Sequence, residues 1–79
     1  MASFGKFETT IVPSPIGLEF EIDTPVSFIV QEHAETGTVV KQLRNSAIIE
    51  IDETHGNRDL MRRSNGVITI NYKHLKKIS

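Results

Sequence analysis

Three short runs rich in β-branched residues lie close together in the chain, at residues 26–30, 38–43 and 47–51. Polar segments that contain Gly, Asn and Ser separate them. Runs of this length with turn residues between them are typical of antiparallel strands joined in a meander. The sequence therefore predicts a small all-β barrel, an architecture that serves binding more often than catalysis.

The chain has 79 residues, which is enough for one domain with one hydrophobic core. It contains no cysteine, so disulfides and thiolate–metal sites are excluded and apolar burial or self-association must supply the stability. The N-terminus lacks the apolar region of a signal peptide, and no apolar run approaches the roughly 20 residues of a membrane-spanning helix. We therefore expect a soluble, cytoplasmic protein with no membrane partner.

Alternating apolar and polar residues indicate which side chains face the core. In residues 18–22, Leu18, Phe20 and Ile22 alternate with two glutamates, as in a strand with one buried face. The runs at residues 26–30 and 47–51 show the same period. The predicted core consists of Leu18, Phe20, Ile22, Phe28, Val30, Val39, Leu43, Ile49, Ile51, Ile68, Ile70, Leu75 and Ile78.

Polar and glycine-containing segments predict where the chain reverses. Residues 32–37 are polar and end in glycine, which favours a turn between two antiparallel strands. The Asn65-Gly66 pair tolerates the positive φ angles of a type I′ turn, and residues 67–72 behind it have a strong strand pattern. Residues 58–63 fit either a helical turn or a strand, and we favour the first arm of a hairpin.

An N-terminal arm at residues 1–16 precedes the predicted barrel domain at residues 17–79. The β-type run at residues 7–12 must end before Pro13, because proline cannot donate to a strand ladder. Aromatic residues on a solvated arm expose an apolar patch that requires cover. We favour an extra strand added to the barrel, and the alternative is a homodimer in which the arm reaches a second subunit. The candidate residues for an arm-mediated interaction are Phe4, Phe7, Ile11 and Val12.

Three runs carry a family resemblance: Gly37-Thr-Val-Val-Lys41, Asn45-Ser-Ala-Ile-Ile-Glu-Ile-Asp52 and the strand pattern that continues from Val67 to Ile78. Through them, residues 26–78 resemble a small uncharacterised bacterial family, the YkvS-like proteins. The resemblance implies an SH3-like barrel of the kind seen in KOW and Tudor-type domains, and it brings no established activity with it. The family has no counterpart for residues 1–25. We therefore expect a five-stranded SH3-like barrel with an N-terminal arm or extra strand.

Motifs for catalysis and metal binding are missing from the sequence. The chain has no Gly-rich phosphate loop, no G-x-S-x-G and no H-E-x-x-H. His33, His55 and His74 lie in three separate segments, and no cysteine accompanies them. We expect histidines exposed in loops and turns, no metal, no cofactor and no enzymatic activity.

Basic and acidic residues are unevenly distributed along the chain. Residues 1–35 carry one base and six acids, whereas residues 36–79 carry eight bases and four acids. Small barrels bind RNA or DNA with basic residues along the phosphates and aromatic rings against the bases. In the predicted hairpin, five basic residues share one edge with a tyrosine and a histidine. The candidate nucleic-acid or partner-binding residues are Arg62, Arg63, Tyr72, Lys73, His74, Lys76 and Lys77.

We expect a non-enzymatic binding module, a protein-interaction or regulatory domain of a bacterium or phage. The acidic first half and the apolar arm favour a protein partner. The alternative is weak nucleic-acid binding through the basic C-terminal edge. Lysines on an edge strand also have a simpler role, which is to prevent pairing with other sheets. The sequence leaves the identity of the partner, the pathway and the oligomeric state open.

Overall fold

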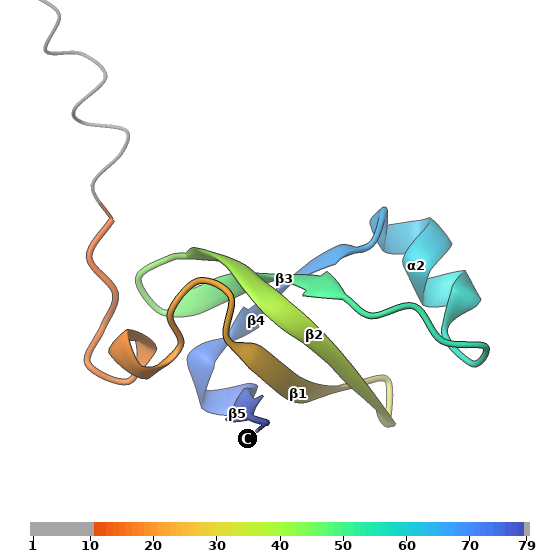
Figure 1. The fold of residues 1–79 in the computed structure, drawn as a ribbon, viewed down its shortest axis with the longest axis horizontal. Helices are drawn as coiled ribbons and strands as arrows, with labels where there is room; N and C mark the ends of the chain where they lie inside the picture. Colours follow the sequence, from red (N-terminus) through yellow and green to blue (C-terminus); the bar gives the residue numbers. More distant parts are fainter. Residues whose placement is uncertain (1–10, 79) are drawn as a thin grey trace, which may run out of the picture.

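The structure, a computed structural model of the chain, describes residues 11–78. These residues form one antiparallel sheet of five strands in the order β4-β3-β2-β1-β5 (Figure 1). The predicted all-β class is confirmed at the level of this sheet. In chain order the elements are η1 (Gly17–Glu19), β1 (Pro25–Val30), β2 (His33–Gln42), β3 (Ser46–Ile51), α2 (Arg58–Ser64), β4 (Val67–Asn71), η2 (Tyr72–His74) and β5 (Lys76–Lys77), where η denotes a 3-10 helix.

The strands β1 to β4 follow one another as a meander, and the last strand β5 returns to pair with β1. Within residues 11–78, β4 and β5 are the two edge strands and do not pair with each other. A β-bulge between Val39 and Lys41 shifts the register of β2 against β3. Because of this bulge Lys41 is exposed and opposite Ile48, whereas Val39 is buried opposite Ile49.

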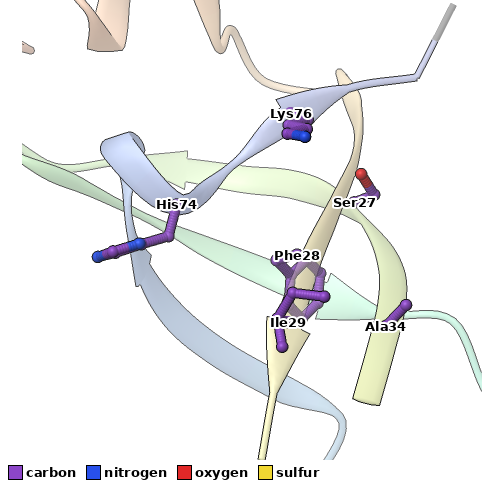
Figure 2. A pocket seen from close by; sticks show the side chains of 6 residues that line it. All are labelled: Ser27, Phe28, Ile29, Ala34, His74 and Lys76. Carbon is purple, nitrogen blue, oxygen red and sulfur yellow. The ribbon is translucent and has the colours of Figure 1, made fainter. Parts of the chain in front are cut away.

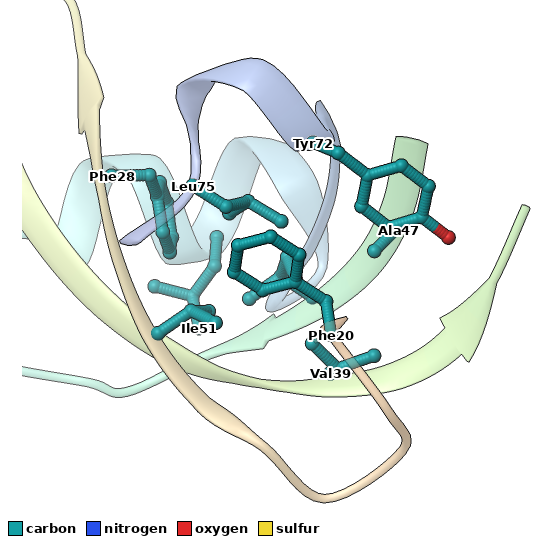
Figure 3. Packing of buried hydrophobic residues seen from close by; sticks show 9 residues of the cluster. Phe20, Phe28, Val39, Ala47, Ile51, Tyr72 and Leu75 are labelled. Carbon is teal, nitrogen blue, oxygen red and sulfur yellow. The ribbon is translucent and has the colours of Figure 1, made fainter. Parts of the chain in front are cut away.

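One hydrophobic core lies on the concave face of the sheet (Figure 3). The predicted alternation is confirmed in β1 and β3, where every second side chain is buried except Val30, which is half-buried against the core. Burial of one such large apolar side chain stabilises the fold by about 1.5–3 kcal/mol. The buried residues are Phe20, Val26, Phe28, Val39, Ala47, Ile49, Ile51, Tyr72 and Leu75, with Val30, Leu60, Met61, Ile68 and Ile70 packed against them.

Tyr72 connects three distant parts of the chain inside this core. Its ring stacks on Phe20, with the ring centroids 5.8 Å apart. Gly17 lies against the same ring, where a β-carbon would overlap it. The phenol O–H donates to the carbonyl oxygen of Leu43 at 2.6 Å. Burial raises the pKa of the Tyr72 phenol above its usual 10.0, because the phenolate would lose its hydration.

Residues 18–22 do not form a strand, so this prediction is wrong. The segment contains η1 and a turn, and Leu18 and Ile22 are 59% and 56% exposed. Only Phe20 reaches the core. The backbone of this segment bonds locally instead: the N–H of Phe20 donates to the carbonyl oxygen of Gly17, and the N–H of Thr24 donates to that of Glu21. Ile78, which follows β5, is also exposed rather than buried.

Residues 58–63 form the helix α2 rather than the arm of a hairpin, so the favoured alternative is wrong. Asn65 and Gly66 do have positive φ angles, 58° and 81°. Their N–H groups both donate to the carbonyl oxygen of Met61, which ends the helix. A helix that ends in a left-handed residue and a type I′ turn require the same backbone angles, so the Asn-Gly pair fits both.

The chain reverses between β1 and β2 earlier than predicted, at Gln31 and Glu32. Both residues have positive φ, 49° and 70°, as a type I′ turn of two residues requires. Residues 33–37 therefore belong to β2, and Gly37 lies inside this strand. A β-carbon on Gly37 would overlap the carbonyl oxygen of Glu50 in β3. Glycine is thus needed there for the close approach of β2 to β3.

One buried polar side chain holds the loop between β3 and α2. The Asn57 amide donates to Glu35 Oε1 and to the carbonyl oxygen of Asp52, both at 2.8 Å. Its Oδ1 accepts the N–H of Thr54 at 2.7 Å. These bonds compensate the burial of a polar group that would otherwise destabilise the fold by about 1–3 kcal/mol. They fix the start of α2 against β2.

We predict that Gly37→Ala destabilises the fold by about 1–3 kcal/mol, because the new methyl group meets the backbone of β3. Gly56→Ala is the matched control, since a β-carbon at Gly56 meets no atom within 4 Å. Its effect should stay within about 0.5 kcal/mol. Urea unfolding followed by circular dichroism measures both. Equal stability of the two variants would contradict the packing described for Gly37.

Tyr72→Phe should be less stable than the wild type at neutral pH by about 0.5–1.5 kcal/mol, because the hydrogen bond to Leu43 is lost. The raised pKa adds a second difference. The phenol ionises more readily in the unfolded chain, so its contribution is present below pH 10.0 and is lost as the pH rises above that value. Stability measured from neutral to strongly alkaline pH should therefore fall more steeply for the wild type than for Tyr72→Phe. Parallel curves would contradict a buried, neutral Tyr72.

Candidate functional site

A groove runs along the outer face of β1 beside η2 and β5 (Figure 2). Its central hollow has a volume of about 160 Å³, and a second hollow continues it toward η2. Figure 2 shows Ile29 between Ala34 on one side and His74 on the other. We call this feature the β1–β5 groove, and it is lined by Ser27, Phe28, Ile29, Ala34, Lys73, His74, Leu75 and Lys76.

The sheet register explains why these side chains come together. Ile29 is opposite Ala34 in β2, and Ser27 is opposite Lys76 in β5. Residues directly opposite each other in antiparallel strands point to the same face of the sheet. The small Ala34 side chain leaves Ile29 uncovered, and Ile29 is 64% exposed.

The 3-10 helix η2 presents two further side chains to the groove. Asn71 caps it by accepting the N–H of Lys73 with its side-chain oxygen at 2.9 Å. Tyr72 and Leu75 are buried on either side of the exposed pair Lys73 and His74. Anchoring by the two buried residues therefore orients the two basic ones toward solvent.

On one side, the backbone of Ile29 has no neighbouring strand among the described residues. β1 bonds to β5 through alternate residues, since Pro25 accepts the N–H of Ile78 and Ser27 is opposite Lys76. By the same alternation, the N–H and C=O of Ile29 point to the β5 side. β5 has already ended there, because its pairing with β1 stops at Ser27. Within residues 11–78, the Ile29 backbone has no strand partner on that side.

The β1–β5 groove is lined by basic side chains and by no acidic ones. Lys73, His74 and Lys76 line it, and none of its lining residues is acidic. A different hollow, near the Gln31–Glu32 turn, carries both signs because Glu35, Asp59 and Arg63 all line it. The β1–β5 groove is therefore the better place for an anionic partner.

Three of the predicted binding residues, Lys73, His74 and Lys76, meet in this groove. Lys77 is on the same strand and alternates to the other face. Arg62 and Arg63 lie on α2, which precedes β4, whereas Lys73 follows it (Figure 1). The five residues of β4 place these groups about 17 Å apart along the strand. Arg62 also pairs with Asp59 at 3.5 Å.

Tyr72 cannot act as a stacking ring, because it is 1% exposed and belongs to the core. The signal for this was present in the sequence, since Ile68, Ile70 and Tyr72 continue one alternating face. The sequence did not indicate three of the groove residues, Ser27, Ile29 and Ala34, whereas it placed Phe28 and Leu75 in the core. The open backbone at Ile29 depends on the length of β5, which no local pattern reveals.

Two of the four predicted arm residues lie within the described residues. Phe4 and Phe7 lie outside the described residues. Ile11 and Val12 are exposed and have no regular secondary structure. The N–H of Ser14 donates to the carbonyl oxygen of Arg44 at 2.8 Å, which attaches the end of the arm to the loop between β2 and β3. The interaction through the arm stays a prediction.

Neither a metal-binding cluster nor a membrane-spanning helix is found in the part of the chain that the structure describes. No group of three or more His, Cys, Asp or Glu residues there is arranged to hold a metal ion. His33, His55 and His74 are exposed in three different places. None of the helices between residues 11 and 78 combines the length and the apolar composition needed to cross a membrane.

Comparison with known proteins found no relative of this chain. A scan against protein-family models, a search of curated proteins and a search of solved structures each found no match. The resemblance to the YkvS-like proteins therefore stays a prediction, and the candidate site rests on its own geometry.

Proposed function

We propose that this protein is a non-enzymatic binding module that holds an extended, acidic segment of a partner protein in the β1–β5 groove. One observation carries the proposal. At Ile29 an exposed apolar side chain and an open backbone lie beside three basic side chains, and no acid lines the groove.

The proposed fold class is an SH3-like barrel, as the resemblance to the YkvS-like proteins implies. Two features support it. β1 pairs with both β2 and the last strand β5, which is a step toward closing a sheet on itself. A single core also fills the concave side of the sheet.

The dimensions of the groove favour a peptide over a small cofactor. Pockets for small molecules usually enclose about 300–1,000 Å³. The central hollow, at about 160 Å³, is smaller than this range and suits one or two side chains. The second hollow, at about 340 Å³, extends the groove past Ile29 toward η2, so the two together form an elongated site. An extended peptide that lies along β1 bonds to the N–H and C=O of Ile29, and its alternate side chains enter the hollow, as in β-strand addition.

The charge of the groove selects an acidic segment. Lys73 and Lys76 are exposed, so each ion pair that they form contributes only about 0.2–1 kcal/mol and weakens with salt. Such pairs act mainly on specificity and on the rate of association. We therefore expect moderate, salt-sensitive affinity for a Glu- or Asp-containing segment.

Nucleic-acid binding has less support. The three aromatic residues of the described chain, Phe20, Phe28 and Tyr72, are all buried, so they offer no ring for a base. The two arginines on α2 lie away from the groove lysines. Three basic groups are few for phosphate binding. A protein partner thus remains the favoured class.

The proposal predicts binding of a fluorescein-labelled peptide of alternating Glu and Val residues, measured by fluorescence anisotropy at low ionic strength. Lys76→Glu should weaken binding about 5- to 30-fold. The substitution replaces an attraction for the acidic peptide by a repulsion, which changes the binding free energy by about 1–2 kcal/mol in total. Lys41→Glu is the matched control with the same change in net charge. Lys41 is exposed at the far end of β2 from Ala34, so its change should be screened.

Two results would contradict the proposal. One is no detectable peptide binding by a folded wild type. The other is an equal loss in Lys41→Glu and Lys76→Glu, which would indicate attraction by net charge alone. A mixed single-stranded oligonucleotide that binds more tightly than the peptide would instead favour the nucleic-acid alternative.

A further inference from the structure

The two edges of the sheet differ in how they are protected. β5 is only two residues long, and both are lysines. Short strands and lysines are the usual means by which proteins prevent pairing at a sheet edge. β4 has five residues, Val-Ile-Thr-Ile-Asn, without a charge or a proline. Within residues 11–78 no strand covers its outer side, so β4 is an edge without protection.

The register shows which backbone groups of β4 are open. Ile51 N–H donates to the carbonyl oxygen of Gly66 at 2.8 Å, and Tyr72 N–H donates to that of Asn45 at 3.0 Å. Between these two points the bonds to β3 alternate, so they involve Ile68 and Ile70. The N–H and C=O groups of Val67, Thr69 and Asn71 therefore point away from β3.

The side chains along this edge are compatible with a close neighbour. Val67 is 42% exposed, and the small polar side chains of Thr69 and Asn71 are exposed as well. Ile68 and Ile70 are only half-buried against the core. A strand placed beside β4 would cover the remaining apolar surface of both isoleucines.

We propose that β4 pairs antiparallel with β4 of a second copy of this chain and joins two sheets into one. The residues with open backbone groups, Val67, Thr69 and Asn71, are symmetrically spaced about Thr69. A two-fold axis at Thr69 therefore pairs this residue with Thr69 of the second copy. The same axis pairs Val67 with Asn71 of the second copy, and all open backbone groups of the strand are then bonded. No like charges face each other across this pairing, because the strand carries none.

Sedimentation equilibrium tests the proposal. The wild type should associate with rising concentration toward twice its chain mass of 8.9 kDa. Thr69→Lys places two ammonium groups at the axis and leaves the bonds between β3 and β4 intact, so the dissociation constant should rise at least 10-fold. Thr54→Lys is the matched control at an exposed loop position and should associate like the wild type.

Hydrogen exchange of the wild type gives a second measurement that does not depend on a variant. The amide protons of Val67, Thr69 and Asn71 should become protected as the concentration rises, whereas the open Ile29 amide should not. A chain that stays monomeric up to about 1 mM would overturn the proposal. So would a dimer that Thr69→Lys leaves unchanged but deletion of residues 1–12 abolishes, because the contact would then belong to the N-terminal arm.

Discussion

The burial of Tyr72 determines where the end of the chain lies, and the candidate site depends on it. The ring stacks on Phe20 and lies against Gly17, and its hydroxyl donates to the carbonyl oxygen of Leu43. Because Tyr72 is fixed in the core, the chain turns through η2 at this point, and β5 then reaches the edge of β1. Lys73, His74 and Lys76 come to the groove through this one anchored turn, and no metal-binding group of residues accompanies them in residues 11–78.

The two edges of the sheet differ, and each suits one of the two proposed contacts. On the β5 side, pairing stops at Ser27 and leaves the Ile29 backbone open beside basic side chains. This combination suits an extended segment that carries acidic residues. On the β4 side, the strand with the open backbone groups carries no charge, and the symmetric spacing of these groups suits pairing with the same strand of a second copy. The proposed dimer leaves the groove free, since β4 and β5 are at opposite ends of the strand order.

Much of the sheet was predictable from alternation alone. In β1 and β3 the period of two follows from burial of one face, and the structure confirms it. The same period in residues 18–22 did not make a strand, because the backbone of this segment bonds locally, within η1 and the turn that follows it. Positive φ angles at Asn65 and Gly66 were predictable. Whether these residues end a helix or form the turn of a hairpin depends on tertiary contacts of α2. Lys73, His74 and Lys76 were identified by charge, whereas Ile29 became visible only from the register, since strand length sets which backbone groups stay open.

The central claim is that the open edge at Ile29 and the basic turn η2 form one binding surface. Titration of the isotope-labelled protein with the alternating Glu-Val peptide, followed by NMR chemical shifts, tests it most directly. The account predicts that the largest shift changes fall on Ile29, Ala34, His74 and Lys76, with little change on α2. Shift changes centred on Arg62 and Arg63, or spread evenly over all basic residues, would contradict it.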